Sequence, residues 1–573
     1  MRRFRFSPAL PWRPAFTAGD GLILLGIIAL LYVGARLAFA VPPVIAGPQI
    51  STSPLALPWY AALSVGRMTV AYFLSLAFSL AYGSAAARNR GARIVLMPLL
   101  DVLQSVPILA FLPMVLLSLS AVLPRGFASE LTAVILIFTS QAWNMTFSFY
   151  QSQATTPSDL REAAAVFRLD PWQRFKTLDL PFSAIGLIWN SMMSWAGGWF
   201  FLMAAEFFKV GSRDFRLPGL GSYLQTAANN LDYKASLLGL ATLVVIIVLM
   251  DQLVWRPILA WADKFKLEMV EGDEPPTSWF LEALSRSWMV SRLAAAWEPR
   301  VERIDAWLHR RAGRRIEPPD PGESKPRLSR FAIGLLVAAS GGALYGASQA
   351  AGMLLKVSAD EWARLALGLL ATFGRVSVSI LIALLWTVPV GVLIGGNRRV
   401  ASVLQPVVQT VASIPATAVF PMLVSILLLV PGGLNLAAVL LMLLGTQWYL
   451  LFNVIAGASA IPLDLRYTTA LLRLGTMDRW KTLILPALFP YIVTGALTAS
   501  GGAWNASIVA EYSEYGGRQS TTGVGALISE ATAAGNYPLL LAGTLSLILT
   551  VITINRSFWR RLYVLAERRY RLD

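Results

Sequence analysis

The sequence predicts an all-α polytopic membrane protein of about twelve transmembrane helices, arranged as two parallel six-helix repeats. Three observations lead to this prediction. Hydrophobic residues make up 56% of the 573 residues, charged residues make up 14%, and the mean hydropathy is +0.59, outside the range of soluble globular domains. Apolar runs of about 20 residues, long enough to cross ~30 Å of hydrocarbon, recur along the chain. The chain also repeats itself after about 300 residues.

The first apolar run, "GLILLGIIALLYVGARLAFA" (21–40), follows the basic start "MRRFRF". Ala38, Phe39 and Ala40 could form a signal-peptidase site. The apolar run before them is longer than the hydrophobic region of a usual signal peptide, so we expect an uncleaved first helix.

The internal repeat is visible in three pairs of segments. They are "GRMTVAYFLSLAFSLAYGSAAARNR" (66–90) with "GRVSVSILIALLWTVPVGVLIGGNR" (374–398), "SVPILAFLPM" (105–114) with "SIPATAVFPM" (413–422), and "WFFLMAAEFFKVGSR" (199–213) with "WNASIVAEYSEYGGR" (504–518). Repeats of this kind are common in transporters.

Six spans are predicted in each half, with boundaries uncertain by several residues. They lie at roughly 20–41, 58–87, 95–123, 128–152, 181–208 and 234–258, and at roughly 328–351, 362–394, 400–430, 433–457, 486–511 and 538–557. The corresponding predicted domains are an N-terminal segment (1–19), a first membrane half (20–258), a charged linker (259–327) and a second membrane half (328–573).

Charge predicts the orientation. The basic stretches at 88–93, 397–399 and 560–573 fall on the same side of the predicted spans as both termini, which the positive-inside rule makes cytoplasmic. The formal net charge is +16, and anionic lipid headgroups explain this basic side better than nucleic acid does. We therefore expect a lipid membrane and no nucleic acid as partner.

The sequence offers little for catalysis or metal binding. It has no cysteine and one histidine, His309, so haem, iron–sulfur and zinc sites lose their usual ligands. No pair of nucleophile and base stands out, and no G-x-x-x-x-G-K-[ST] motif is present to cradle a nucleotide phosphate. We expect no catalytic residue, no metal and no cofactor in this chain.

Two charged segments stand at matching places between apolar runs. "EAAAVFRLDPWQRFKTLDLP" (162–181) and "YTTALLRLGTMDRWKTLILP" (467–486) share the R-L, R-[FW]-K-T-L and L-P elements at the same spacing. Each predicts a short helix across the cytoplasmic face, and together they predict a paired docking surface.

These segments, within 153–181 and 458–486, resemble the EAA loop of binding-protein-dependent ABC importer permeases. Its signature is E-A-A, a glycine four residues after the second alanine, and a closing L-P. The first copy matches E-A-A, the second replaces it, and both have arginine at the glycine position. The residues expected to couple to ATPases are Glu162, Ala163, Ala164, Arg168, Asp170, Tyr467, Thr468, Thr469, Arg473 and Gly475.

The S-[VI]-P turns and the W-x₅-A-E pattern narrow the resemblance to the nitrate, sulfonate and taurine subclass, with two permease domains fused in one chain. The resemblance implies the type I importer fold in a bacterial inner membrane, crossed many times with both termini cytoplasmic. It implies ATP-driven import of a small solute, an anion such as nitrate, sulfonate or taurine, from a periplasmic substrate-binding protein. It also implies two copies of a separate ATP-binding subunit, which would bind ATP and Mg²⁺.

Ionisable residues inside the spans are costly and need a reason. Arg67 and Glu206 come out at similar depth near the outer boundary, as do Arg375 and Glu511. A structural pair in each half is one interpretation, and contact with substrate or binding protein is the other.

Residues that could line the translocation pathway are Ser105, Pro107, Ser413, Pro415, Asn144, Asn505, Glu206 and Glu511. Both prolines are expected to break a helix, which either exposes backbone groups to the pathway or merely kinks the packing. For the amides Gln141, Asn144, Asn190, Gln447, Asn453 and Asn505, hydrogen bonds between helices are as good an explanation as substrate contact.

Two questions stay open at the level of sequence. Between Trp279 and Trp307 the linker spaces Trp and Leu between charges, which predicts an amphipathic helix on the membrane or on the repeats, unless the linker is a passive tether. A secondary transporter with two parallel six-helix halves is the alternative function, but it would have no use for matched docking segments. A membrane-embedded enzyme or electron carrier is disfavoured by the lack of cysteine and the single histidine.

Overall fold

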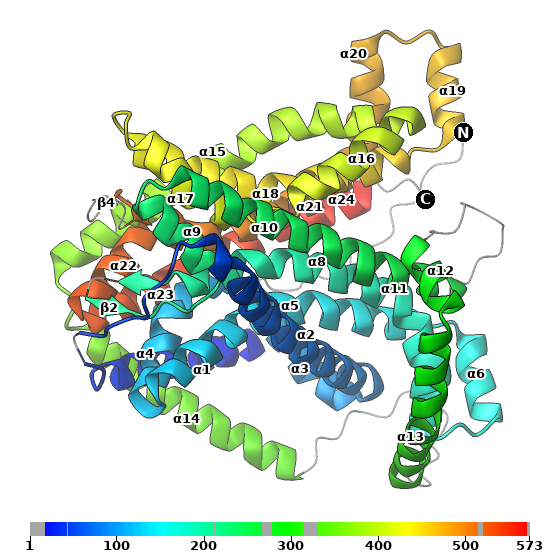
Figure 1. Cartoon of the computed structure of the whole chain (residues 1–573), viewed down its shortest axis with the longest axis horizontal. Helices are drawn as coiled ribbons and strands as arrows, with labels where there is room; N and C mark the ends of the chain where they lie inside the picture. The colour runs from blue at the N-terminus through cyan, green and yellow to red at the C-terminus, as the bar shows by residue number, and fades with distance from the viewer. Residues whose placement is uncertain are drawn as a thin grey trace.

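A computed structural model describes residues 18–42, 44–210, 212–265, 278–312, 330–513 and 519–569. The fold is all-α apart from two two-residue hairpins, as the sequence predicted, and the long helices run roughly side by side (Figure 1). The basic start "MRRFRF" and the acidic parts of the linker lie outside the described residues.

The long helices of the two halves follow the same order. In the first half they are α1 (Ala18–Ala38), α2 (Leu57–Arg88), α3 (Arg90–Ser105), α4 (Leu112–Val122), α5 (Arg125–Ala154), α8 (Leu180–Glu206) and α10 (Tyr233–Met250). In the second half they are α14 (Arg330–Leu354), α15 (Ala359–Gly396), α16 (Arg398–Ala412), α17 (Ala416–Leu427), α18 (Gly433–Ser459), α21 (Leu485–Ala510) and α23 (Tyr537–Ile554).

Among the described residues, seven helices are long and apolar enough to cross a membrane, or nine if each bent pair counts as one span. The other three predicted spans are also helices, namely α5, α8 and α14, but they are not among those nine. In α5 the reason is its polar interior face: Thr146 donates its hydroxyl to Ser79 Oγ of α2 at 2.9 Å. The twelve predicted spans are thus helical in the described part of the chain, but only nine of them, with each bent pair counted once, are long and apolar enough to cross a membrane.

The predicted spans 95–123 and 400–430 are each broken in two. The pair α3 and α4 bends by 84°, and the pair α16 and α17 bends by 74°. The breaks fall at Pro107 and Pro415, since proline lacks the N–H that would continue a helix. The predicted break at both prolines is confirmed.

Short elements fill both ends of the bundle. At one end are β1 (Lys209–Val210), β2 (Arg213–Asp214) and α9 (Leu220–Asn229) in the first half, and β3 (Tyr512–Ser513), β4 (Gln519–Ser520) and α22 (Val524–Ala534) in the second. The hairpins are antiparallel, with Lys209 opposite Asp214 and Tyr512 opposite Ser520. These elements were not predicted from the sequence.

The charged segments lie at the other end. They are α6 (Ser158–Val166), α7 (Pro171–Arg174) and the π-helical η3 (Phe175–Asp179), and in the second half α19 (Leu463–Leu471), α20 (Thr476–Arg479) and the π-helical η6 (Trp480–Ile484). The last span of the first half ends in α11 (Arg256–Ala262). The linker contributes η5 (Asp263–Phe265), α12 (Trp279–Arg286) and α13 (Trp288–Ala312), and the described chain ends with η7 (Asn555–Trp559) and α24 (Arg560–Arg569). We name residues 158–179 the first docking segment and residues 463–484 the second; Figure 1 shows both at the same end.

Close helix packing holds each half together. Helices in a membrane associate through close contact between small residues, because lipid tails are as apolar as the side chains. On α15, Gly391 and Gly395 form a G-x-x-x-G face against α18. A Cβ added at Gly395 would lie 2.4 Å from the carbonyl oxygen of Ile455, so only glycine permits this approach.

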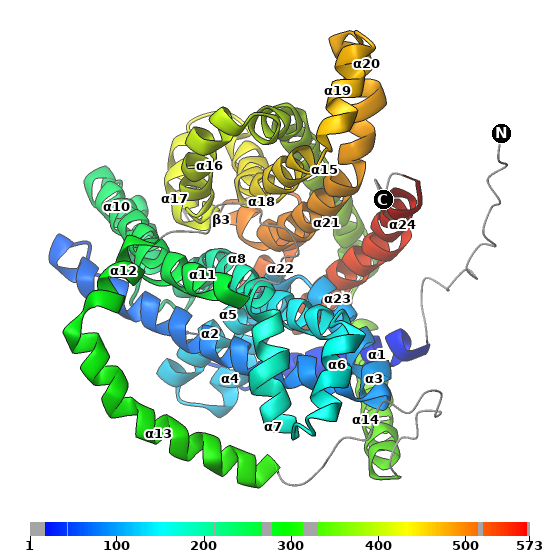
Figure 2. The same cartoon turned by 90° about the vertical axis from the view of Figure 1, so that its right-hand side faces the viewer.

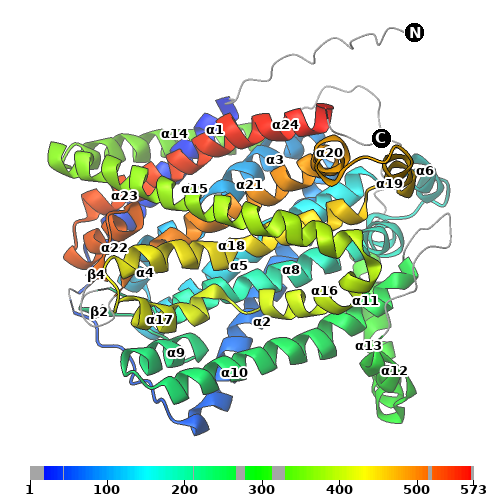
Figure 3. The same cartoon turned by 90° about the horizontal axis from the view of Figure 1, so that it is seen from above.

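The two halves share one core. Leu109 of the first half lies in the same buried cluster as Trp504 and Leu540 of the second, and Trp504 is only 1% exposed. The first helices are placed unequally: α14 packs against α1 and α23, and it lies far from α10 (Figures 2 and 3). The halves are therefore related by their repeat but do not form a symmetric pair.

Candidate functional site: the docking segments and the cavity between the halves

The first docking segment is a helix, a tight turn and a second helix. After α6 the chain turns at Arg168, whose φ is +48°, and Leu169 N–H donates to the Ala164 carbonyl at 3.1 Å. Asp170 then caps α7 by accepting hydrogen bonds from the N–H groups of Trp172 and Gln173 at 2.8 and 2.9 Å. From Pro171 the helix continues through η3 into α8, so the turn is fixed to a membrane helix.

The second docking segment repeats this backbone with different side chains. Arg473 also has a φ of +48°, and Leu474 N–H donates to the Thr469 carbonyl at 3.2 Å. Gly475 precedes α20 without a side-chain cap. The glycine of the family signature is thus replaced twice by an arginine that adopts the left-handed conformation glycine favours, so the turn keeps its shape.

The predicted coupling residues divide into exposed and buried ones. Glu162 and Arg168 are exposed, whereas Ala164 is buried where α6 folds back. In the second segment Tyr467 is 64% exposed and Thr469, which stands in the place of Ala164, is buried. Their role in coupling stays a prediction.

Sequence reasoning missed an apolar pair at the tip of each segment. Val166 and Phe167 are 79% and 76% exposed, and their counterparts Leu471 and Leu472 are 83% and 65% exposed. Exposed apolar side chains at matched positions of a repeat point to a surface that a partner covers. The signal was present in the sequence as two apolar residues that directly precede R-L in both copies.

The surroundings of the two segments differ. Linker helix α13 contacts the first segment through Asp305, which accepts hydrogen bonds from Trp172 Nε1 at 2.7 Å and Lys176 Nζ at 2.9 Å. Met477, the counterpart of Trp172, is 65% exposed. The linker is therefore helical over its described part and rests on one repeat.

At the opposite end, Arg67 and Glu206 form the predicted pair. Arg67 Nη1 lies 2.8 Å from Glu206 Oε1, and the guanidinium also binds Glu130 with two hydrogen bonds of 2.6 Å. Glu206 is completely buried and accepts further hydrogen bonds from Ser64 Oγ at 2.7 Å and from Gly221 N–H at 2.7 Å. The carboxylate thus joins α2, α8 and the start of α9.

The second half repeats the arrangement with one carboxylate fewer. Arg375 Nη1 lies 2.7 Å from Glu511 Oε1, and Glu511 accepts from Thr372 Oγ1 at 2.7 Å and Gly525 N–H at 2.9 Å. Asn435 stands where the first half has Glu130 and accepts from Arg375 Nη2 at 2.7 Å. The pairing predicted from depth is confirmed in both halves.

A glycine precedes each of these helix starts and makes room for the carboxylate. A Cβ added at Gly219 would lie 2.3 Å from the Glu206 carboxyl, and one added at Gly523 would lie 2.1 Å from Glu511 Oε2. This G-x-G repeat was not used in the sequence analysis. A pathway role for Glu206 and Glu511 stays a prediction, and in this structure both carboxylates are engaged by the protein.

The broken helices contact the partner half at equivalent points. Leu109 N–H, just after Pro107, donates to Asn505 Oδ1 at 3.3 Å. Its counterpart Thr417, just after Pro415, donates its hydroxyl to the Phe200 carbonyl at 3.1 Å. The structure thus brings Asn505 to the break that follows Pro107, and a pathway role for either residue stays a prediction.

The other predicted pathway residues lie apart from this contact. Ser105 accepts from Asn555 Nδ2 at 3.0 Å, Ser413 donates to its own helix at Gln409, and Asn144 is exposed on α5. The amides also differ from expectation: Asn190, Asn453 and Asn505 donate to carbonyls four residues back in their own helices. Among these amides, hydrogen bonds across elements are present at Gln447, which accepts from Trp386 Nε1 at 3.2 Å, and at Asn505. Of the two explanations left open, hydrogen bonds between helices do not account for Asn190 and Asn453, because their side chains reach the nearer backbone.

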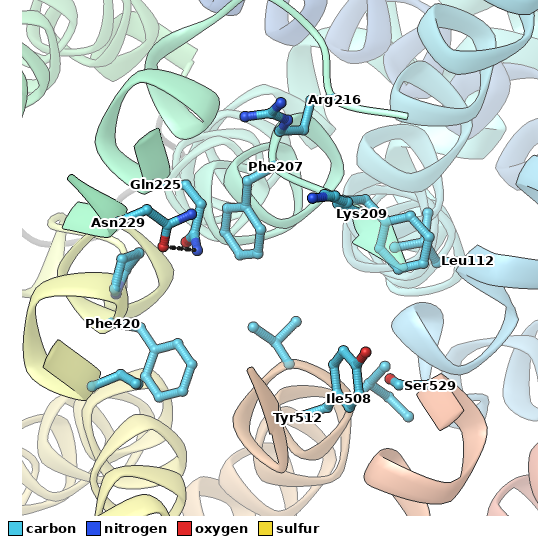
Figure 4. A pocket seen from close by; sticks show the side chains of 14 residues that line it. Leu112, Phe207, Lys209, Arg216, Gln225, Asn229, Phe420, Ile508, Tyr512 and Ser529 are labelled. Carbon is cyan, nitrogen blue, oxygen red and sulfur yellow. Dashed lines mark hydrogen bonds between the residues drawn. The ribbon is translucent and has the colours of Figure 1, made fainter. Parts of the chain in front are cut away.

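A cleft opens between the halves at the end away from the docking segments. It is partly open to solvent, and residues of both halves line it. Figure 4 shows Phe207, Phe420 and Tyr512 around it and Lys209 extending toward Phe207. Arg216 also lines the cleft, but Asp214 engages its guanidinium at 2.6 Å.

The charge of the cleft comes from the first half. Among the described lining residues none is acidic, while Lys209, Gln225 and Asn229 supply hydrogen-bond donors. A basic, partly aromatic cleft of this kind favours a small anion. The sequence marks position 209 as a difference between the halves, because the matching position of the second half is a glutamate, Glu514. Glu514 lies outside the described residues.

Comparison with known proteins gives matches in both halves. A family model described as "Binding-protein-dependent transport system inner membrane component" matches residues 74–254 and again 387–571. Two similar proteins are named nitrate import permease protein NrtB: the one from Synechococcus elongatus is 29% identical over 171 residues, 30% of this chain and 58% of that protein, and the one from Leptolyngbya laminosa is 30% identical over 173 residues, 30% and 59%. The bicarbonate transport system permease protein CmpB of Synechococcus elongatus is 32% identical over 142 residues, 25% of this chain and 50% of that protein. The chain thus spans about half the length of the curated relatives it matches.

Proposed function

The chain belongs to the family of binding-protein-dependent transport system inner membrane components and carries its domain twice, and from this premise we propose that it is the membrane subunit of an ATP-driven importer. Both permease domains of the importer would reside in this one chain. Membership in a transport family agrees with a role in translocation rather than in chemistry.

One observation carries the proposal most directly: the two docking segments share a backbone and present exposed apolar tips. Val166 with Phe167, and Leu471 with Leu472, offer each of two ATP-binding subunits an apolar anchor. Both segments continue into membrane helices, α8 and α21, so a movement of the bound subunit is transmitted to the spans. ATP and Mg²⁺ would be bound by those separate subunits.

We infer the orientation from the same arrangement. The docking segments face the cytoplasm together with both termini, and the cleft faces the periplasm of a bacterial inner membrane, where a substrate-binding protein delivers the solute. The secondary-transporter alternative gains no support, because the buried carboxylates Glu206 and Glu511 are bound by arginines and backbone N–H groups.

The proposed solute is a small anion. The support is Lys209 in a cleft without acidic lining among the described residues, together with relatives whose names specify nitrate and bicarbonate. Which anion is carried does not follow from the cleft alone, since a binding protein would select it first.

Native mass spectrometry of the complex, purified from its own host, tests the subunit arrangement. We expect two ATP-binding subunits per chain. The double substitution Val166→Asp with Phe167→Asp should release one of them, and Leu471→Asp with Leu472→Asp should release the other. One ATP-binding subunit, or none, on the unmodified chain would refute the fused permease.

Uptake into proteoliposomes tests the cleft. Lys209→Gln should lower anion uptake about tenfold, as expected for loss of one charge-assisted hydrogen bond, whereas Lys209→Arg should retain most of it. Equal uptake by the wild type and both variants would show that Lys209 does not meet the solute.

A further inference from the structure

Linker helix α13 lies across the ends of the membrane helices. In Figure 1 it runs across the direction of α8 and α10, and Figure 2 shows it curving along the edge of the first half. The curve has a local cause in Pro299, which sits inside the helix. If the long helices cross the bilayer, α13 lies parallel to its surface at the end that carries the docking segments.

One side of α13 holds the first docking segment. Asp305 accepts from Trp172 Nε1 and Lys176 Nζ, and one turn later His309 contacts the Asp170 carboxylate. The hydrogen bonds from Lys176 and Trp172 lower the pKa of the Asp305 carboxyl, so Asp305 is charged near neutral pH. Asp170 is also the residue that caps α7, so α13 contacts the part of the segment that directly follows its turn.

A different side of α13 is apolar and uncovered. Trp297 and Ile304 are each 58% exposed. Successive residues of a helix are about 100° apart, so Ile304 projects well away from its neighbour Asp305. Trp297 and Ile304 stand seven residues apart, about two turns of the helix, so they share one face.

Basic residues flank the apolar face. From Trp288 to Ala312 the helix contains five arginines and three carboxylates. The guanidinium of Arg300 stands over the ring of Trp297 at 5.1 Å, and Arg292 stands over Trp288 at 4.0 Å. Tryptophan beside arginine on a half-apolar helix is the composition of helices that lie in the headgroup region of anionic membranes.

We propose that α13 is an interfacial helix, bound to the anionic lipid surface through Trp297, Ile304 and its arginines, that holds the first docking segment at a fixed depth. An acidic lipid surface is favoured over a protein partner because the helix runs along the outer edge of the bundle, parallel to the bilayer, with arginines worth about 1 kcal/mol each near such a surface. The second docking segment has no contact of this kind with a described linker helix, so the two segments differ in freedom. We call the contact between α13 and the first docking segment the brace. The lipid contact is independent of the function proposed above, whereas a use of the brace in coupling rests on that function.

The chain suits a labelling test because it has no cysteine. A nitroxide is attached at Ile304→Cys, or at Glu302→Cys as the matched control on the opposite side of the helix, in the full chain within nanodiscs of phosphatidylcholine and phosphatidylglycerol in equal parts. Accessibility to oxygen relative to a water-soluble nickel chelate should be several-fold higher at residue 304. Equal ratios at the two positions, or exclusion of both reagents at residue 304 as under a protein partner, would overturn the lipid assignment.

The brace has its own measurement. Nitroxides at Ile304→Cys and Phe167→Cys report the distance between α13 and the tip of the first docking segment by pulsed electron resonance. Asp305→Ala with His309→Ala should broaden that distance distribution, and Glu302→Ala, an exposed carboxylate on the same helix, should leave it narrow. An unchanged width in the Asp305→Ala and His309→Ala variant would refute the brace. Neither label experiment needs transport, so their failure is distinguishable from failure of the proposed function.

Discussion

The two docking segments have the same backbone but different surroundings. Both turn at an arginine with φ of +48°, and both lead through a π-helical segment into a membrane helix. Only the first has a capping box at Asp170 and a described linker helix against it. The comparison teaches that the shape of such a segment is set locally by its turn, whereas its mobility is set by what packs beside it.

The same comparison holds at the other end of the bundle. Glu206 and Glu511 receive equivalent hydrogen bonds, but their arginines differ in second partner, Glu130 in one half and Asn435 in the other. Equivalent residues of the two halves are therefore expected to contribute unequally to the stability of the fold.

The largest effect is expected at Glu511. Glu511→Ala leaves Arg375, whose side chain is only 11% exposed, with neutral acceptors only, which should cost about 3 kcal/mol of stability. Glu206→Ala should cost less, because Arg67 keeps both hydrogen bonds to Glu130. Thermal unfolding of the two variants in nanodiscs measures the difference.

Double variants provide the control for this comparison. Arg375→Leu with Glu511→Leu removes the unpaired charge and should recover much of the loss seen for Glu511→Ala. Strictly additive losses from the two single substitutions would contradict a direct pair, and a greater loss at Glu206 would reverse the ranking of the halves.

A smaller effect is expected in coupling. Glu162 is exposed and can accept a charge-assisted hydrogen bond from an ATP-binding subunit, worth about 1.5–3 kcal/mol. Glu162→Ala should therefore lower ATP hydrolysis stimulated by the binding protein about tenfold, and Tyr467→Ala should lower it less, with assembly retained in both. A larger loss at Tyr467 would make the second segment the dominant one.

Arg168→Gly and Arg473→Gly should have mild and equal effects. A non-glycine residue in the left-handed region costs about 1–2 kcal/mol, while glycine adds entropy to the unfolded chain, so each turn should gain at most about 1 kcal/mol. Hydrogen exchange at Leu169 and Leu474, whose N–H groups close the two turns, measures this gain. A response at one turn alone would show that the shared backbone does not persist in solution.

The smallest effect concerns pH. Because Lys176 and Trp172 lower the pKa of Asp305, its carboxylate stabilises the contact at every pH above the ordinary value of about 3.9, and this contribution is lost only as the pH falls through the lowered value. In a His309→Gln background, the distance distribution between residues 304 and 167 should not change from about pH 8 to pH 5. Broadening within that window would mean that Asp305 does not hold the contact.

Features that repeat in the sequence were predictable. The helices, the breaks at Pro107 and Pro415, and the pairing of Arg67 with Glu206 follow from hydropathy, proline chemistry and matching depth. Arg168 shows the limit: its sequence position argued against the family's turn, but the surrounding hydrogen bonds impose the left-handed conformation on an arginine.

Features that depend on one half alone were not predictable. Glu130 stands at the start of α5 and becomes a partner of Arg67 only when α5 packs beside α2. Asp305 reaches Trp172 across 133 positions of sequence, which no local pattern encodes. Lys209 gains meaning only from the cleft that both halves build.

Because α1 and α14 are placed unequally, the two sides on which the halves meet differ, and we call each of these interfaces a seam. At the seam beside α23, Arg556 of η7 binds Asp20 of α1 with both guanidinium nitrogens, one at 2.7 Å, and Asn555 binds Ser105 of α3. The repeat places Gln252 where Arg556 stands, and Gln252 donates to its neighbour Asp251 at 3.1 Å and accepts from Trp279 Nε1 of the linker at 3.4 Å. If the two halves move apart, we expect the interface held by Arg556 and Asp20 to act as the hinge. The side beside α10 would then be the one that opens.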